Sequence, residues 1–363
     1  MECQRYFPPS RWESYMIKMP KTVTVKVAGH SVEGRPIYAL FLGSGSKKVF
    51  MWSQMHGNET TTTRALVDFI PWFLASEQAN LREQLSLCIV PQLNPDGAQR
   101  YTRLNANGID LNRDAVQLSQ PESKLLRMLF DEFQPQYCLN LHGQRTIYAA
   151  GSNGKPASVS FLSPSADPER SITLARKSAM QHIVAMQNEL SKTLPKGIGR
   201  YDDTFNENCV GDTFSMLNVP TILFEAGHYA NDYAREKTKA FILKAYKAFC
   251  TSIVNEPADY RVSDYLKIPE NKIEYVDIIV SGVTIKTADG IKKDQFLRLQ
   301  YEEVLKENKI HFVPAMHSYG DSSGFKGHQN ISLPSTLKNK IFEFNEGFLL
   351  EFAEFHELYL EKP

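Results

Sequence analysis

The sequence has no excess of either charge and few cysteines. Both facts limit the partners and the cellular compartment that can be expected for the protein. Lys plus Arg and Asp plus Glu each number 41, so the formal net charge is zero. Without a positive field, neither nucleic acid nor a membrane surface is favoured as a partner. The five cysteines are odd in number and include no C-x-x-C pair. We therefore expect reduced thiols, a cytoplasmic location and a small or peptidic substrate.

Long apolar runs are also missing. No uninterrupted run approaches the roughly 18 residues that span a bilayer, and the first residues contain no apolar stretch of signal-peptide length. Repeats and low-complexity tracts are absent. What is present is a chain of 363 residues, 42% of them hydrophobic. This length fits one large domain plus a smaller one, and it leaves the oligomeric state open.

Short apolar runs alternate with longer helical patterns through about residue 255, which predicts an α/β domain over residues 1–255 with a mixed sheet flanked by helices. The expected strands are Thr22–Val27, Ile37–Leu42, Val49–Trp52, Leu85–Val90, Tyr137–Leu141 and Thr221–Phe224. The expected helices are Thr60–Ala75, Pro121–Phe133, Pro168–Leu194 and Ala230–Val254.

The pattern changes after Glu256-Pro257, and residues 256–363 are expected to form a small α+β appendage of unknown role. Within it, Lys272–Lys286 is typical of one or two strands. Asp294–Lys306 and Leu337–Phe355 are interpreted as helices, with a polar loop between them around residues 322–324.

His56 and Glu59 form the first chemical signal, because they lie three residues apart just after an expected strand. Zinc accepts imidazole nitrogen and carboxylate oxygen, and a catalytic zinc keeps three protein ligands plus one open position. His142 ends another expected strand, and sites in open α/β sheets gather at the carboxyl ends of strands. His142 is therefore the expected third ligand, although an isolated H-x-x-E is also typical of a surface or capping pair.

A second signal is an arginine-rich loop. Asn94-Pro95-Asp96-Gly97 is a turn by composition, and Arg100, Arg103 and the segment from Gly108 to Arg113 follow it. Arginines next to a metal suggest an anion-binding pocket, because the guanidinium fork matches a carboxylate. Solvated loop arginines are the alternative.

The third signal is Glu225, which closes the buried apolar run Thr221–Phe224. An acidic group there is costly unless it is paired or functional. A helix cap or a salt bridge would also explain it.

Taken together and in this order, the signals resemble the zinc carboxypeptidase family typified by carboxypeptidase A. The resemblance covers about residues 22–250, and no H-E-x-x-H motif points to another class of zinc hydrolase. The matching stretches are Ser31–Ile37, His56-Gly57-Asn58-Glu59, Asn94-Pro95-Asp96-Gly97, Arg103, Asp110-Leu111-Asn112-Arg113, Leu141-His142 and Phe224-Glu225.

The resemblance implies a role for each matched residue. His56, Glu59 and His142 would bind one zinc ion per chain. Asp110 would accept the free ring N–H of His56. The remaining roles concern the substrate: Asn112 and Arg113 would hold its terminal carboxylate, Arg103 would polarise the scissile carbonyl, and Glu225 would be the catalytic base.

Some positions depart from the family pattern. Asp114 and Ala115 follow Arg113 where the family usually has Asn and an aromatic residue, which places an extra carboxylate near the anion pocket. Tyr201 is the candidate for the family's mobile active-site tyrosine, and Asp212 is a candidate for lining the side-chain pocket. His228 is interpreted as structural, and the irregular spacing of His311, His317 and His328 does not favour a second metal site.

The expected reaction is zinc-dependent hydrolysis of a C-terminal peptide bond, which releases an amino acid. A zinc-dependent deacylase of N-acyl amino acids is the first alternative, since such enzymes are similar in fold and ligand set. A non-catalytic peptide-binding module is the second, although neither a ligand nor the base is missing from the sequence.

Overall fold

Alternating side chains along the central strands bury the main sheet on both faces. In β3 (Lys47–Ser53), Val49 and Met51 join one apolar core, whereas Phe50 and Trp52 join another on the opposite face. Strand β4 (Leu85–Val90) alternates in the same way. Because side chains in a strand point alternately to the two faces, these apolar runs require cover on both sides.

The computed structural model describes residues 5–152, 154–255, 259–333, 337 and 340–343. Its main sheet is mixed and eight-stranded, in the order β1-β2-β4-β3-β5-β9-β7-β8. Strands β4, β3, β5 and β9 are parallel neighbours, and β2 and β7 join them antiparallel. The remaining bounds are β1 (Thr24–His30), β2 (Pro36–Leu42), β5 (Tyr137–Gly143), β7 (Val159–Leu162), β8 (Ile198–Arg200) and β9 (Thr221–Ala226).

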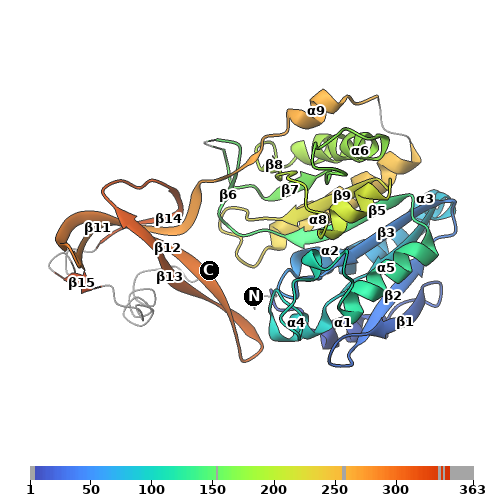
Figure 1. Cartoon of the computed structure of the whole chain (residues 1–363), viewed down its shortest axis with the longest axis horizontal. Helices are drawn as coiled ribbons and strands as arrows, with labels where there is room; N and C mark the ends of the chain where they lie inside the picture. Colours follow the sequence, from blue (N-terminus) through green and yellow to red (C-terminus); the bar gives the residue numbers. More distant parts are fainter. Residues whose placement is uncertain (1–4, 153, 256–258, 334–336, 338–339, 344–363) are drawn as a thin grey trace.

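Helices cover both faces of this sheet (Figure 1). Helices α2 (Thr61–Leu74), α6 (Leu174–Ser191) and α8 (Glu236–Val254) contribute to the first core. Helices α5 (Pro121–Phe133) and α7 (Val210–Met216) contribute to the second. The shorter helices are α1 (Pro9–Met16), α3 (Ala79–Gln84), α4 (Pro95–Arg100) and α9 (Val262–Leu266), and η1 (Ser76–Gln78) and η2 (Leu111–Arg113) are single 3₁₀ turns.

The predicted α/β class is confirmed, and every strand and helix expected before residue 255 has a counterpart. The ends differ by several residues in places, since α6 begins at Leu174 and α8 at Glu236. Beyond residue 255, Tyr265 and Ile268 still pack into the first core of the main sheet. Strand β10 (Asn271–Ile273) then pairs with β6 (Tyr148–Ala150).

A second sheet follows, and here one sequence prediction is wrong. The helix expected at Asp294–Lys306 is the C-terminal part of the long strand β12 (Gly290–Lys306), which pairs with β11 (Tyr275–Thr287) and β13 (Lys309–Gly320). Leu297, Leu299 and Tyr301 are buried two residues apart, a strand period. Pairing along both edges therefore overrides the helix propensity of Leu, Gln, Glu and Lys.

Strands β14 (Lys326–Ser332) and β15 (Ile341–Glu343) pair with the other edge of β11. The expected strands at Lys272–Lys286 and the loop near residues 322–324 are confirmed. The helix expected at Leu337–Phe355 is wrong at residues 341–343, which are β15, and residues 344–355 lie outside the described residues.

No described helix combines the length and apolar character needed to cross a membrane. The described cysteines, Cys88, Cys138, Cys209 and Cys250, are free thiols. The cytoplasmic location expected from the sequence stays a prediction.

Candidate active site and metal centre

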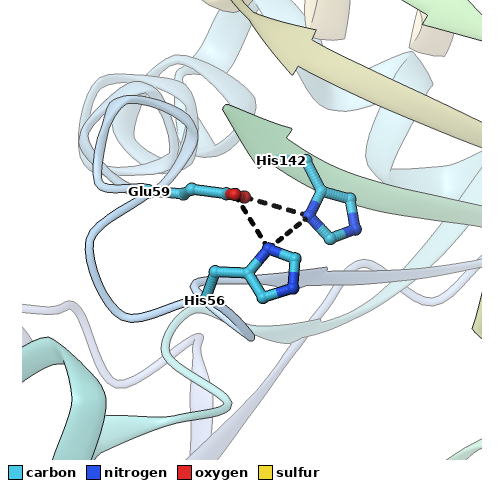
Figure 2. Close-up of side chains that lie close together, drawn as sticks. All are labelled: His56, Glu59 and His142. Carbon is cyan, nitrogen blue, oxygen red and sulfur yellow. Dashed lines mark hydrogen bonds and ion pairs between the residues drawn. The ribbon is translucent and has the colours of Figure 1, made fainter. Parts of the chain in front are cut away.

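Three side chains from two neighbouring chain segments converge at the carboxyl ends of the parallel strands. His56 and Glu59 lie in the turn between β3 and α2, and His142 lies near the end of β5. Since β3 and β5 are parallel neighbours, the turn that follows β3 comes beside the end of β5. Figure 2 shows the two imidazoles and the carboxylate pointing toward one another.

The distances within this group suit a metal ion. His56 Nδ1 lies 2.8 Å from Glu59 Oε1 and 3.2 Å from His142 Nδ1, and His142 Nδ1 lies 3.0 Å from Glu59 Oε2. A tetrahedral zinc ion with ligands at about 2.0–2.1 Å places neighbouring donor atoms roughly 3.3 Å apart. Within the described residues, this is the one group of His, Cys, Asp or Glu side chains that could hold a metal ion. Donor types and spacing therefore both fit zinc.

Asp110 orients the imidazole ring of His56. Its Oδ1 lies 3.0 Å from His56 Nε2 and also accepts a hydrogen bond of 2.9 Å from the backbone N–H of Asn112. With Nε2 engaged, Nδ1 faces Glu59 and His142. Burial opposes a charge on the ring, but Glu59 and Asp110 outweigh it and raise the pKa of His56 to about 9.

Arg103 lies beside the same carboxylates. Its Nε and one terminal nitrogen donate to Asp110 Oδ2 at 3.1 and 3.0 Å, and the other lies 3.3 Å from Glu59 Oε1. Burial by itself would raise the pKa of the Asp110 carboxyl, but His56 and Arg103 together hold that pKa below its ordinary value. The guanidinium is therefore fixed next to the candidate metal ligands, while the Arg103 side chain stays 46% exposed and lines the cavity.

Glu225 is held on the same face of the sheet as His142, because the two residues are paired in register between β9 and β5. Burial, and then the negative charge of Glu59, raise the pKa of the Glu225 carboxyl well above its ordinary value. Its Oε2 is buried and makes no hydrogen bond to any described residue. A carboxylate held in this way is suited to exchanging a proton with a bound molecule.

A cavity of about 1020 Å³ joins these groups to the arginine-rich loop. Asn112 is fixed because its side-chain oxygen accepts the backbone N–H of Val210 at 3.0 Å. Arg113 is exposed to the cavity, where one terminal nitrogen lies 2.7 Å from Asn112 O and 3.1 Å from Cys209 Sγ. In the part of the chain that the structure describes, Arg113 has no carboxylate partner.

Tyr201 and Asp212 also line this cavity. The Tyr201 hydroxyl lies 3.0 Å from that of Tyr148, and burial raises the pKa of Tyr201 above its ordinary value. Burial likewise raises the pKa of Asp212 to about 6, although its carboxylate accepts the backbone N–H of Asn206 at 2.9 Å. Tyr201 therefore faces the cavity, and its role as the family's mobile tyrosine stays a prediction.

Asp114 does not place an extra charge in the cavity. Its carboxylate accepts the backbone N–H groups of Ser119 and Gln120, both at 2.9 Å, and it is absent from the cavity lining. His228 is also outside the cavity, and its ring packs against Tyr233 and His328.

Sequence reasoning missed a second group of residues that line the cavity. Arg5, Arg145, Arg235, Tyr301 and Glu303 come from the N-terminal segment, from two loops and from β12. None of these residues belongs to a motif. Their place in the cavity wall follows only from the tertiary structure, which brings distant segments of the chain together.

Known proteins are similar to this chain in sequence and architecture. The family model described as zinc carboxypeptidase matches residues 10–243, which is more than half of the chain. Among solved structures, a metallo-carboxypeptidase from Burkholderia cenocepacia superimposes with a TM-score of 0.54 at 17% identity, covering 68% of this chain and 70% of that one. Carboxypeptidase A from Helicoverpa armigera gives 0.51 at 19% identity, covering 68% and 72%.

Curated sequences are similar over shorter stretches. Carboxypeptidase 2 of Trichophyton rubrum is 27% identical over 124 residues, which is 31% of this chain and 23% of the relative. Carboxypeptidase SOL1 of Arabidopsis thaliana is 26% identical over 191 residues, 47% of this chain and 38% of the relative. The matches thus span about a quarter to two fifths of these relatives' lengths.

The fold is that of known metallo-carboxypeptidases, and the donor set suits a zinc ion. The chain belongs to the zinc carboxypeptidase family, as its sequence motifs predict. Zinc-dependent hydrolysis of peptide bonds is the activity of that class.

Proposed function

We propose that the protein is a carboxypeptidase that removes the last residue from peptides with a free terminal carboxylate. The observation that carries the proposal is Arg113. It is exposed in the cavity that contains His56, Glu59, His142 and Glu225, and it has no acidic partner among the described residues. A guanidinium in this position matches a carboxylate in bidentate fashion.

Zinc, held by His56, Glu59 and His142 in a proposed ratio of one ion per chain, supplies Lewis acidity and a water of lowered pKa. Asp110 keeps His56 oriented toward the ion. Arg113 and Asn112 hold the terminal carboxylate and so place the last peptide bond beside Arg103. The Arg103 guanidinium stabilises the negative charge that develops on the carbonyl oxygen.

Glu225 moves the proton. Its unpartnered Oε2 accepts a proton from the attacking water as the water oxygen bonds to the carbonyl carbon. When the C–N bond breaks, Glu225 returns the proton to the nitrogen of the leaving amino acid. Tyr201 and Asp212 line the cavity where the leaving residue is held.

The test compares a peptide that has a free C-terminal acid with its C-terminally amidated twin. A charge-assisted hydrogen bond contributes roughly 1.5–3 kcal/mol, so the wild type should have a kcat/KM about 10- to 100-fold higher for the acid. Arg113→Ala should abolish most of this preference. Arg113→Lys should restore only part of it, because an ammonium cannot grip both oxygens in one plane.

Arg127→Gln is the matched control, because Arg127 pairs with Asp131 on α5 and does not line the cavity. Equal rates on acid and amide in the wild type would refute the proposal. N-acyl amino acids belong in the same assay, and turnover of these alone would favour the deacylase alternative.

A further inference from the structure

The second sheet is joined to the catalytic cavity through defined polar contacts. Glu303 of β12 pairs with Arg5 and accepts a hydrogen bond from the Tyr101 hydroxyl. The Tyr233 hydroxyl donates to Asp277 of β11 at 2.8 Å. Figure 1 shows the hairpin of β12 and β13 reaching toward the start of the described chain and α4, where Ile310 packs with Tyr6 and Tyr101. The sheet is thus a fixed wall of the cavity.

Residues 144–146, which follow the ligand His142, are held from two directions. Arg235 of the loop before α8 donates to the backbone oxygen of Gln144 at 2.7 Å. From the second sheet, Gln300 of β12 donates to Thr146 Oγ1 at 2.6 Å, and His328 of β14 lies with its Nε2 2.9 Å from Thr146 O. Both residues that flank Arg145 are therefore anchored.

Arg145 itself is exposed and lines the cavity. Its guanidinium forms no hydrogen bond or ion pair with any of the residues that the structure describes. The anchored backbone on either side limits where this side chain can reach. An arginine that is presented to a catalytic cavity without a partner is available to an anionic group of a bound molecule.

Arg235 adds a second positive charge near Arg145, because its guanidinium donates to the backbone oxygen of the neighbouring Gln144. It lines the same cavity, as do Arg5 and Glu303, which pair with each other. The Arg235 Nε is buried and has no hydrogen-bond partner among the described residues.

We propose that Arg145, held in place by β12, recognises a carboxylate on the part of the peptide that precedes the cleaved bond. The inference rests on the proposed function, because Arg113 of η2 is then occupied by the terminal carboxylate, which leaves Arg145, from the loop after β5, for another group of the peptide. The substrate class is therefore peptides with an acidic residue on the amino side of the last peptide bond. Thr146 and Gln300 act as positioning residues for Arg145.

The experiment uses the zinc-loaded enzyme and peptides that share one C-terminal residue. Glu replaces Gln at the first, second or third residue before the cleaved bond, and the ratio of kcat/KM for the Glu and Gln peptides is measured. At one of these positions the wild type should favour Glu by about 3- to 30-fold, a range set by a charge-assisted bond in a partly exposed site. The ratio should fall as salt is added.

Arg145→Gln should bring the ratio close to one, and Arg145→Lys should keep part of it. Arg127→Gln, the remote control, should leave it unchanged. Thr146→Val removes the hydroxyl that binds Gln300, so the ratio should fall through KM, with kcat nearly constant. Thr146→Ser should restore it.

Two results would overturn the inference: a Glu to Gln ratio near one at all three positions in the wild type, or an unchanged ratio in Arg145→Gln. Either result with the preference for the free acid intact removes only the role of Arg145. Loss of the free-acid preference in the wild type removes the proposed function as well. An unchanged ratio in Thr146→Val refutes the positioning role of β12.

Discussion

Asp110→Asn is the substitution that best separates metal binding from catalysis. Asp110 Oδ1 receives His56 Nε2 and the backbone N–H of Asn112, whereas Oδ2 receives two nitrogens of Arg103. In the asparagine variant, the amide oxygen keeps the first position because both groups there are donors. The NH₂ group then faces Arg103, where donor meets donor. One change therefore weakens the support of His56 and removes one of the two carboxylate partners of Arg103, leaving the contact with Glu59.

The magnitude follows from these contacts. Loss of the carboxylate charge behind a metal-bound histidine typically lowers metal affinity by about 10- to 100-fold, or about 1.4–2.7 kcal/mol. The same substitution leaves Arg103 less firmly held beside the reacting carbonyl. We expect this displacement to lower kcat by up to about 10²–10³, even when zinc is saturating. Asp110→Asn should thus show both losses.

Arg103→Gln is the matched comparison, because it leaves the contact between Asp110 and His56 in place. It should lower kcat while zinc affinity stays within about three-fold of wild type. Zinc affinity is measured by competition with a chromophoric chelator, and kcat at saturating zinc. If Asp110→Asn binds zinc as tightly as wild type, the assignment of Asp110 as the support of His56 is wrong.

Three further predictions concern the base, the metal and stability. Glu225→Gln should keep zinc and fold but lose about 10²–10⁴ in kcat, and near-normal turnover would place the base elsewhere. Metal analysis should give one zinc per chain for wild type and little for His56→Ala or His142→Ala, and chelation should lower the Tm because the ion binds only the folded site; full activity in metal-free protein would contradict this. Burial lowers the pKa of His182 to about 4 from 6.5, so the unfolded chain binds the extra proton and the free energy of unfolding falls by up to about 3 kcal/mol from pH 7 to pH 4. Urea unfolding at several pH values should show this decrease in the free energy of unfolding for wild type but not for His182→Gln. The same pH dependence in both proteins would refute the prediction.

The convergence of the candidate ligands and the candidate base could be predicted from the sequence, because local patterns fix where they lie. His56, His142 and Glu225 each stand at the end of a short buried run, and parallel strands bring such ends to one edge. The arginine-rich loop suggests an anion-binding pocket, but the particular roles of Asp110 and Arg113 could be proposed only through resemblance to the family. Their contacts depend on a loop conformation, and the closing turn η2 is a single 3₁₀ turn.

The second sheet could not be predicted in the same way. β12 contains Leu, Gln, Glu and Lys, which favour helices in isolation, and its strand state depends on partners on both edges. The cavity wall depends on contacts between residues far apart in the sequence, such as Arg5 with Glu303 and Thr146 with Gln300. No single stretch of sequence carries a signal for such a wall.

Two carboxylates lie in one buried cavity, and their mutual repulsion is a reason why the site requires a cation. Glu59 and Glu225 are both largely buried, and the charge of Glu59 adds to burial in raising the pKa of Glu225. A raised pKa favours the protonated form, which cannot accept a proton at neutral pH. A divalent ion held by Glu59 carries the opposite charge, so it offsets the effect of Glu59 and shifts the pKa of Glu225 downward. On the proposed assignment, Glu59 therefore both binds the ion and sets the proton affinity of the base, Glu225.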